Sequence, residues 1–342
     1  MKKRILLFNF FAGVLRRGIP LYVENLSVAL QRSGNRCYQV RCPKFLCGLP
    51  RPVLNALFVI VEQLIMPVAA LFFDRTIYPY NSVAVLAGFS RRASVLVHDQ
   101  IPNHVRDRKL AARYIRATQK LYAKLGGDAI YSSSTTMRTG KRIRQFPASR
   151  EFFFPNTFYN LISLRSDSPP AREDFALLCS GWGKHKDLPG ALNLYLQSGL
   201  YRLRPLRILG LAGRMEQVNA FCSEHPEIAD RITVYPRLSD SSVVRAFETA
   251  AWIWIHSLRE GFGRPVAEAR LCGGRVVATS IPQFREQADE YTFFYSGLAQ
   301  FQSAIAGCEA APEDAPRRPH SEHDRLMIEI ERFITVSQPQ LP

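Results

Sequence analysis

The sequence predicts an α/β protein with two domains, each built on a parallel sheet. Its 342 residues exceed the roughly 250 to 300 at which one hydrophobic core usually stops growing, and 47% of them are apolar. Short apolar runs that suit strands covered on both faces alternate with stretches of helical periodicity. This alternation is typical of parallel sheets flanked by helices.

The first half of the chain shows the alternation from its start. Residues 4–10 (RILLFNF) form a continuous apolar run typical of a buried strand, and residues 22–31 have helical periodicity that ends at Ser33 and Gly34. Further short strands are expected at Val40, 94–98 and 129–131.

The second half repeats the pattern after a break. The polar, proline-containing segment 166–172 interrupts the alternation. Strands are then expected at 175–179, 206–209, 232–235, 252–256 and 275–279, with helices such as 189–197 and 241–249 between them. We therefore expect an N-terminal domain over 1–165, a C-terminal domain over 166–320, and a C-terminal helix and tail over 321–342 that can pack back on the first domain. Two such domains facing each other create a cleft, and open α/β sheets bind ligands beyond the carboxyl ends of their strands.

Positive charge is concentrated in the first half. Residues 1–165 hold 26 lysines and arginines against 7 acidic residues, a net charge of +19, whereas the whole chain carries +16. Residues 106–124 combine seven basic side chains with apolar ones at helical spacing, which indicates a basic amphipathic helix. A basic half of this kind can bind nucleic acid, an anionic membrane surface or an acidic substrate. Alternatively, the basic residues form the solvated face of an ordinary helix.

Residues 53–73 form an apolar run about as long as a membrane span requires. Asn55, Glu62, Gln63 and Pro67 interrupt the run, and a charge at mid-span is expensive. We expect a helix buried in a domain, with a surface that can touch lipid.

The start of the chain and its cysteines indicate a reducing compartment. The basic start, Met1 to Arg4, runs into a short strand without a small-residue cleavage site, so we expect no signal peptide and a cytoplasmic protein. Seven cysteines are an odd number, and buried free thiols are expected rather than disulfides. Cys37, Cys42 and Cys47 lack a fourth ligand nearby, and no metal site is predicted from them.

Residues 252–279 carry the strongest chemical signal. An apolar strand leads into Glu260, a glycine turn formed by Gly261, Phe262 and Gly263, and a helix that begins near Pro265 and contains Glu268. Glycines allow close backbone approach, and a helix N-terminus offers free N–H groups to an anion. The segment can therefore bind a sugar diphosphate, whose hydroxyls would donate hydrogen bonds to the carboxylates. Alternatively, it is an ordinary glycine turn followed by a helix whose first turn carries a charge that interacts with the helix dipole.

Glu260 and Glu268, separated by seven residues that include Gly-Phe-Gly-x-Pro, resemble the signature of the group 1 (family 4) retaining glycosyltransferases of the GT-B fold. Other segments resemble this family in the same order, and the likeness covers nearly the whole chain. These segments are Arg17 to Leu26, His98-Asp99-Gln100-Ile101-Pro102, Ser132 to Ser134, Pro155-Asn156, Gly181 and Lys186-Asp187-Leu188.

The resemblance implies a role for each matching residue. Lys186 would meet the donor diphosphate, Glu260 the hydroxyls of the transferred sugar, and Glu268 the ribose. The backbone from Gly261 through Phe262 to Gly263 would hold sugar and phosphate. His98, with Asp99 beside it, would contact the sugar or acceptor, and Gly18 would let the first loop approach the phosphates.

The sequence departs from the family pattern at three positions. Trp182 follows Gly181 where the family has an arginine, so that either Lys184 supplies the missing charge or the phosphate is held more weakly. Arg264 replaces an apolar residue, and His256 replaces a proline.

The resemblance also implies the chemistry and the partners. We expect transfer of a hexosyl or deoxyhexosyl group, mannose-type favoured, from a nucleotide-diphosphate sugar with retention and without a metal ion or other cofactor, since no Asp-x-Asp pair lies near the donor loop. The implied acceptor is a glycan or lipid-linked glycan of bacterial surface polysaccharide or lipopolysaccharide synthesis, at the inner face of the cell membrane. A phosphorylase of the same fold and a non-catalytic glycan or nucleotide binder are the alternatives. A nucleic-acid partner is not expected, because no recognisable module accompanies the charge.

Overall fold

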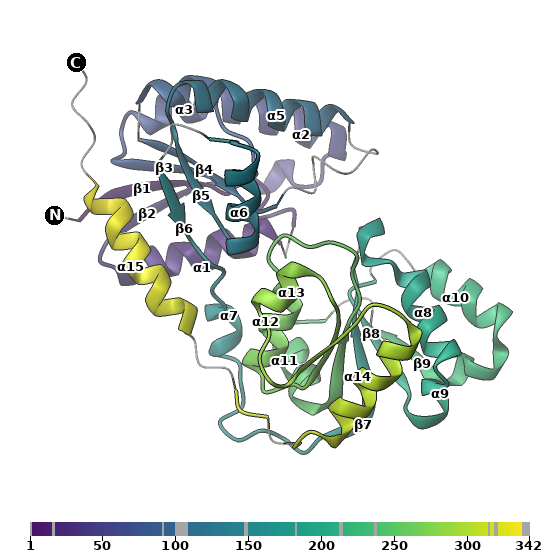
Figure 1. Cartoon of the computed structure of the whole chain (residues 1–342). Helices are drawn as coiled ribbons and strands as arrows, with labels where there is room; N and C mark the ends of the chain where they lie inside the picture. The colour runs from purple at the N-terminus through teal and green to yellow at the C-terminus, as the bar shows by residue number, and fades with distance from the viewer. Residues whose placement is uncertain are drawn as a thin grey trace. The chain divides into compact units, whose positions relative to one another are not determined.

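Two six-stranded sheets of parallel strands organise the chain, as the computed structural model shows (Figure 1). One unit comprises residues 1–157 together with 321–342, and the other comprises residues 158–320. The expected α/β class with two Rossmann-like units is confirmed. The structure describes residues 2–15, 18–90, 92–99, 109–146, 150–181, 183–211, 215–235, 238–313, 315–317 and 321–336.

The first sheet has the order β2-β1-β3-β4-β5-β6. Its strands are β1 (Arg4–Phe8), β2 (Arg36–Val40), β3 (Arg75–Tyr78), β4 (Ala93–Val97), β5 (Asp128–Tyr131) and β6 (Glu151–Phe153). β3 and β6 were not expected from the sequence, because each contains only two apolar residues and so shows no continuous apolar run. Side chains alternate across the sheet, so that Leu6 and Phe8 pack on one face while Ile5 and Leu7 are buried on the other.

Except for α15, the helices of this unit connect successive strands. They are α1 (Ile19–Arg32), the 3-10 helix η1 (Lys44–Leu46), α2 (Arg51–Ile60), the π-helical turn η2 (Val61–Ile65), α3 (Met66–Ala70), the 3-10 helix η3 (Val85–Ser90), α5 (Lys109–Lys124), α6 (Ser134–Arg142) and α15 (Ser321–Thr335). α2, α3 and α5 pack on the face of the sheet that carries Leu6 and Phe8. Helix α5 corresponds to the predicted basic helix, of which Arg106 and Arg108 lie outside the described residues.

Helices α2 and α3 are continuous through the π turn and bury a single narrow stripe. Leu54, Phe58, Glu62, Met66 and Ala70 are buried at a constant spacing of four. Because an α-helix has 3.6 residues per turn, such a spacing drifts by about 40° at each step. The π turn takes up more residues per turn and returns Met66 and Ala70 toward the sheet.

The expected burial of this helix applies to one stripe only, and the surface expected to be open to lipid is the larger part. Only 28% of its most apolar window is buried inside the structure, and the helix is long and apolar enough to be a candidate membrane span. The buried stripe packs on the first sheet, and the opposite side of the helix remains exposed.

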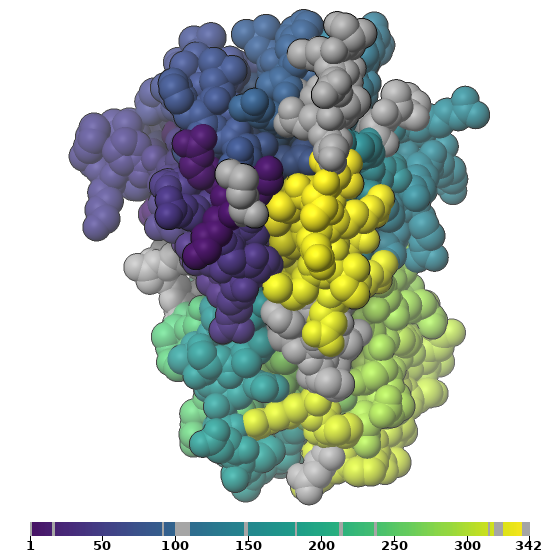
Figure 2. Space-filling view, turned by 90° about the vertical axis from the view of Figure 1, so that its left-hand side faces the viewer, coloured from purple at the N-terminus to yellow at the C-terminus, as the bar shows by residue number. Residues whose placement is uncertain are grey.

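The last helix of the chain completes the first unit. In Figure 2, α15 (yellow) lies against the purple N-terminal residues and the blue-green residues of the same unit. The ring of Phe333 packs edge-on against Phe152 and Phe154, at centroid distances of 5.0 and 5.4 Å. Leu326, Ile330 and Phe333 are all buried, so the helix contributes directly to the core.

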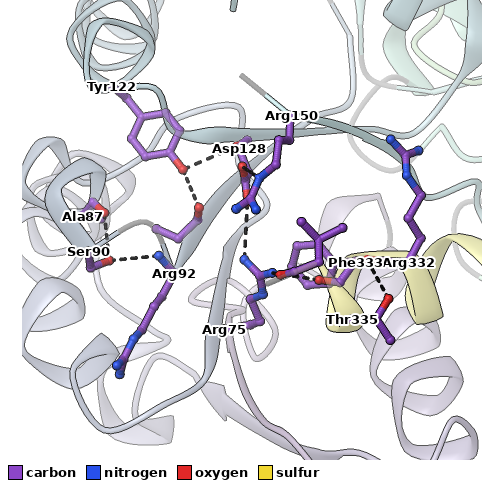
Figure 3. Close-up of polar contacts among 12 residues, drawn as sticks. Arg75, Ala87, Ser90, Arg92, Tyr122, Asp128, Arg150, Arg332, Phe333 and Thr335 are labelled. Carbon is purple, nitrogen blue, oxygen red and sulfur yellow. Dashed lines mark hydrogen bonds and ion pairs between the residues drawn. The ribbon is translucent and has the colours of Figure 1, made fainter. Parts of the chain in front are cut away.

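Arg75 fastens the end of α15 to the sheet (Figure 3). Its Nη2 donates to the carbonyl oxygens of Phe333 at 2.9 Å and Val336 at 3.0 Å, which compensates for partners that a helix end lacks. Its Nη1 lies 3.4 Å from Asp128, and Asp128 also accepts two hydrogen bonds of 2.8 Å from Arg150. The buried guanidinium is therefore paired with charge and carbonyl groups on several sides.

The second sheet has the order β12-β11-β10-β7-β8-β9. Its strands are β7 (Glu173–Cys179), β8 (Leu206–Leu209), β9 (Ile232–Tyr235), β10 (Ala250–Ile255), β11 (Val276–Thr279) and β12 (Thr292–Tyr295). The predicted 206–209 and 232–235 match β8 and β9, whereas β12 was not expected.

Helices cover both faces of this sheet, and each face has its own hydrophobic core. One core includes α7 (Tyr159–Ile162), α11 (Asp240–Thr249), α12 (Arg264–Leu271) and α13 (Pro282–Glu286). The other includes α8 (Leu188–Gln197), α9 (Leu200–Leu203), α10 (Met215–Glu224), the 3-10 helix η6 (Pro226–Arg231) and α14 (Leu298–Ala310). Phe158 and Leu161 are buried in the first of these cores, which explains why the unit begins at Phe158 rather than at the expected residue 166.

We expect α15 to contribute strongly to stability. Replacing the fully buried Phe333 with alanine leaves a cavity against Phe152 and Phe154, and should lower the free energy of unfolding by about 3 to 5 kcal/mol. Chemical denaturation of the full chain measures this change. Ile328→Ala, on the same helix but 66% exposed, is the matched control and should change stability by less than about 0.5 kcal/mol. Equal effects of the two variants would contradict this assignment of α15 to the core.

Candidate functional site

The strand order of the second sheet points to one place for a ligand. The chain forms β7, adds β8 and β9 on one side, and then adds β10, β11 and β12 on the other. The loops that follow β7 and β10 therefore leave their strands in opposite directions. In open parallel sheets such a reversal opens a crevice at the carboxyl ends of the strands, where ligands bind.

The loop after β7 carries the predicted Lys186. The short 3-10 helix η5 (Lys184–Lys186) follows Gly183, and Asp187 then takes a left-handed conformation with φ of 40°. The Asp187 carboxylate accepts a hydrogen bond of 3.3 Å from the Gly190 backbone N–H and so caps α8. Lys184 is exposed, and Trp182 lies outside the described residues.

The loop after β10 brings Glu260 to the same place. The Lys186 ammonium and the Glu260 carboxylate form an ion pair, with side chains only 14% and 12% exposed. His185 joins the two loops, since its carbonyl accepts hydrogen bonds from Leu258 N at 2.7 Å and Ser257 Oγ at 3.1 Å. The structure therefore brings together two predicted site residues that lie 74 positions apart in the sequence.

Gly181, Lys186 and Glu260 form the centre of the candidate site. A Cβ placed on Gly181 would lie 3.5 Å from Cε of Lys186, which is an ordinary contact. Glycine is thus not required there by local packing, and its value would lie in the approach of a ligand to the backbone.

The glycine turn leads into α12 as predicted. Gly263 has φ of 89°, and a Cβ there would lie 2.9 Å from the Gln283 carbonyl oxygen, so glycine is required at this position. Gly261 does not share the left-handed conformation. Phe262 is buried next to Phe158, and no side-chain cap is found at the described N-terminus of α12.

Glu268 lies one turn inside α12 and has a partner of its own. Its Oε1 accepts a hydrogen bond of 2.7 Å from Arg264, whose guanidinium stacks 5.2 Å from the ring centre of Phe158. Arg264, which departs from the family pattern, thus balances the charge of Glu268 within the same helix.

A chain of buried hydrogen bonds behind the site was not predicted. Trp254 Nε1 donates to the Tyr295 hydroxyl at 2.7 Å, and this hydroxyl lies 2.5 Å from His256 Nδ1. Because the Asp187 carboxylate can only accept, a neutral His256 accepts the Tyr295 hydroxyl proton at Nδ1 and carries its own proton on Nε2. That nitrogen lies 3.3 Å from the Asp187 carboxylate.

These hydrogen bonds form a relay that ends at Asp187, in the loop that carries Lys186. The members of the relay are Trp254, Tyr295, His256 and Asp187. Burial lowers the pKa of His256, which favours the neutral ring that the relay requires, and the carboxylate of Asp187 opposes this effect only in part. Burial also raises the pKa of Tyr295, which keeps the hydroxyl protonated. His256 stood out in the sequence only as a departure from the family pattern.

In the first unit, His98 lies at the end of β4. Its backbone N–H donates to Asn81 Oδ1 at 2.7 Å, and its ring packs edge-on against Tyr22, with centroids 4.8 Å apart. Asp99 follows and is partly buried. Residues 100–102 of the expected motif and Arg17 of the first loop lie outside the described residues. Gly18 directly precedes α1 and has φ of 76°, a conformation that favours glycine.

The first sheet also has a reversal of strand order, between β1 and β3, and sequence reasoning missed its polar residues. Asn9 follows β1, is fully buried, and accepts a hydrogen bond of 3.2 Å from the Tyr80 hydroxyl after β3. The Asn9 amide donates to Gln39 at 3.1 Å. The sequence held one signal for this contact: Asn9 and Tyr80 each follow a strand, and the carboxyl ends of parallel strands lie at the same edge of a sheet.

Metal ligands are sparse in the described part of the chain. Among these residues no group of three or more His, Cys, Asp and Glu is placed to hold a metal ion. All seven cysteines have free thiols.

Comparison with known proteins identifies the fold. No protein-family model matches the sequence, and no curated protein is significantly similar to it. The solved sucrose-phosphate synthase of Thermosynechococcus elongatus is 15% identical, with a TM-score of 0.69 over 97% of this chain and 96% of the other. HepE of Anabaena, solved with UDP and glucose, is 15% identical, with a TM-score of 0.63 over 98% and 97%. A glycosyltransferase of Rickettsia africae is 12% identical, with a TM-score of 0.67 over 97% and 96%. The chain therefore has the GT-B fold.

Proposed function

We propose that this chain is a glycosyltransferase that uses a nucleotide-diphosphate sugar. The observation that carries the proposal is the pairing of Lys186 with Glu260 at the strand reversal, beside the N-terminus of α12. A cation and a helix end suit a diphosphate, and a carboxylate suits sugar hydroxyls. The solved complex of HepE with UDP and glucose supports a donor of this class.

Each residue of the site has a role in this proposal. Lys186 and the start of α12 hold the diphosphate, aided by the exposed Lys184 and by the close backbone approach that Gly181 allows. Glu260 leaves its ion pair with Lys186 and accepts hydrogen bonds from the sugar, while the turn from Gly261 to Gly263 encloses sugar and phosphate. Glu268 accepts from the ribose hydroxyls.

The reaction that these groups serve is transfer with retention. The bond between the anomeric carbon and the diphosphate oxygen breaks, and the departing anion is stabilised by Lys186 and the helix dipole. The acceptor hydroxyl attacks the oxocarbenium-like carbon from the same face, and its proton passes to the departing phosphate. The positive groups take the place of a metal clamp in this scheme, so no cofactor is proposed.

We assign the acceptor to the first unit. His98 and Asp99 at the end of β4 contact the sugar or acceptor, and Gly18 lets the first loop come close to phosphate. The proposed acceptor is a glycan or lipid-linked glycan of bacterial surface polysaccharide, and the proposed donor sugar is a hexose or deoxyhexose, with mannose favoured. The enzyme would act at the inner face of the cell membrane as a peripheral protein, since the positive charge of the first half suits an anionic surface.

A nucleotide screen tests the proposal. We expect one of UDP, GDP, CDP and dTDP, or its sugar, to raise the melting temperature and to bind in calorimetry, because a ligand of the folded state stabilises it by mass action. The preferred nucleotide then defines the donor for an acceptor search. Absence of binding at millimolar concentration would reject the donor site, and release of a sugar phosphate from a glycan by inorganic phosphate alone would favour a phosphorylase.

Two substitutions separate binding from transfer. Glu268→Ala should weaken nucleotide binding roughly tenfold or more, because ribose hydroxyls lose a charged acceptor. Glu260→Ala should leave nucleotide affinity within a few-fold and lower kcat by about 100-fold, since it removes contacts to the reacting sugar. Calorimetry with the nucleotide and initial rates with the donor sugar measure the two effects. Wild-type behaviour of both variants would remove these residues from the site.

His256 should give the protein a distinctive dependence on pH. The pKa of His256 is lower in the folded protein than in the unfolded chain. At pH values between these two pKa values the unfolded chain therefore binds more protons. The free energy of unfolding falls as pH drops from about 6.5, the ordinary pKa of histidine, through the folded pKa. His256→Gln should be less stable than wild type at pH 7.5, and this gap should narrow at pH 5.5. Melting temperatures at the two values measure the gap. The control is His225→Gln, which replaces a partly exposed histidine of the same unit. A gap that is constant with pH would argue against a neutral His256 in the relay.

A further inference from the structure

The side of α2 and α3 that faces away from the sheet is strongly apolar. Leu64, Val68 and Phe72 are exposed by 65%, 59% and 66%, and their spacing of four continues along the helix on the side opposite the buried stripe. Leu86 and Phe89 of η3 are exposed by 59% and 65% beside them. Exposed apolar patches of this kind mark interaction sites or membrane contacts.

Helix α5 adds positive charge to the same side. η3 packs against both α3 and α5, and the three helices α2, α3 and α5 lie together at one edge of the unit in Figure 1. Arg113, Arg116, Lys120 and Lys124 are all exposed on α5. Arg92 extends the charge to α3, since its guanidinium lies 3.5 Å from the Leu71 carbonyl oxygen. We call the exposed side chains of α2, α3, η3 and α5 the apolar–basic face.

Acidic residues are missing from the sequence of this face. Between residues 51 and 98 the only acidic residues are Glu62 and Asp74, and residues 109–127 contain none. Asp74 lies outside α3 and accepts a hydrogen bond of 2.7 Å from the Arg4 backbone N–H. Glu62 is fully buried and cannot offset the exposed charge. Two copies of the face brought together would place like charges side by side with no acid to pair them, which opposes self-association. A partner must supply apolar surface and negative charge together, and an anionic lipid bilayer does both.

The buried contacts decide how the helix can meet a bilayer. The Glu62 carboxylate accepts hydrogen bonds from Ser82 at 2.6 Å and from the Tyr114 hydroxyl, and Gln63 donates to it at 3.2 Å. Leu54, Phe58 and Met66 pack in the core of the first unit. A helix that crossed the membrane would have to abandon these contacts, so only its outer side is available to lipid.

We propose that the apolar–basic face docks on an anionic bilayer, with α2 and α3 lying in the plane of the interface. Leu64, Val68 and Phe72 enter the boundary between headgroups and acyl chains, and the α5 cations contact anionic headgroups. This proposal rests on the peripheral location proposed above and assigns it to a defined surface. It does not depend on the donor chemistry of the second unit.

Vesicle flotation tests the docking face. Wild-type protein should bind vesicles of phosphatidylcholine with phosphatidylglycerol, bind much less to phosphatidylcholine alone, and lose binding as salt rises. The triple variant Leu64→Gln, Val68→Gln, Phe72→Gln should bind at least tenfold more weakly, and Arg113→Glu with Lys120→Glu should do the same. The matched control is Leu203→Gln with Ile328→Gln, side chains that are 70% and 66% exposed elsewhere, and it should bind as wild type does.

Several outcomes would overturn the docking face. Failure of the wild type to bind anionic vesicles, or equal binding by wild type and both face variants, would reject it. A dimer in light scattering that the triple variant dissociates would assign the face to a second copy instead. The rise in melting temperature caused by the nucleotide is measured on the wild type and on every variant, which distinguishes the two proposals. If the wild type shows no such rise, the donor site is rejected, and vesicle binding remains an independent result.

Discussion

A reversal in strand order governs where chemistry can occur in this protein. In the second sheet the chain grows outward from β7 in one direction and then returns to build β10 on its other side. The two loops that part at this point carry Lys186 and Glu260, and nothing in the local sequence of either loop would hold the pair together without the shared sheet. Topology supplies the proximity, and the side chains supply the charge.

Buried residues behind the candidate site hold the loop that carries Lys186. Asp187 caps α8, receives the end of the relay from His256, and immediately follows Lys186 in the chain. Its left-handed backbone is one that non-glycine residues seldom adopt, and these side-chain contacts offset the cost. The relay therefore holds Asp187, the residue that directly follows Lys186 in this loop.

Regular elements and contiguous motifs could be predicted from the sequence. The strands at 206–209 and 232–235 and the start of α12 near Pro265 follow from apolar runs and from glycine and proline chemistry. β3 and β6 contain only two apolar residues each, too few to mark a strand, whereas β12 was missed although it is as long and as apolar as β9. The π turn depends on how one helix packs on a sheet, and the contact of His256 with Tyr295 joins residues 39 positions apart.

The placement of α15 has a consequence for synthesis of the chain. The first unit is interrupted after Thr157 by the whole second unit and resumes only at Ser321. While the ribosome makes the intervening residues, Phe152 and Phe154 lack the ring of Phe333 that covers them in the finished protein. Because domains fold as units during synthesis, the inserted unit can complete its core before the unit that contains the N-terminus can complete its own. The apolar surface around Phe152 and Phe154 therefore stays uncovered in the nascent chain until the residues of α15 have been made.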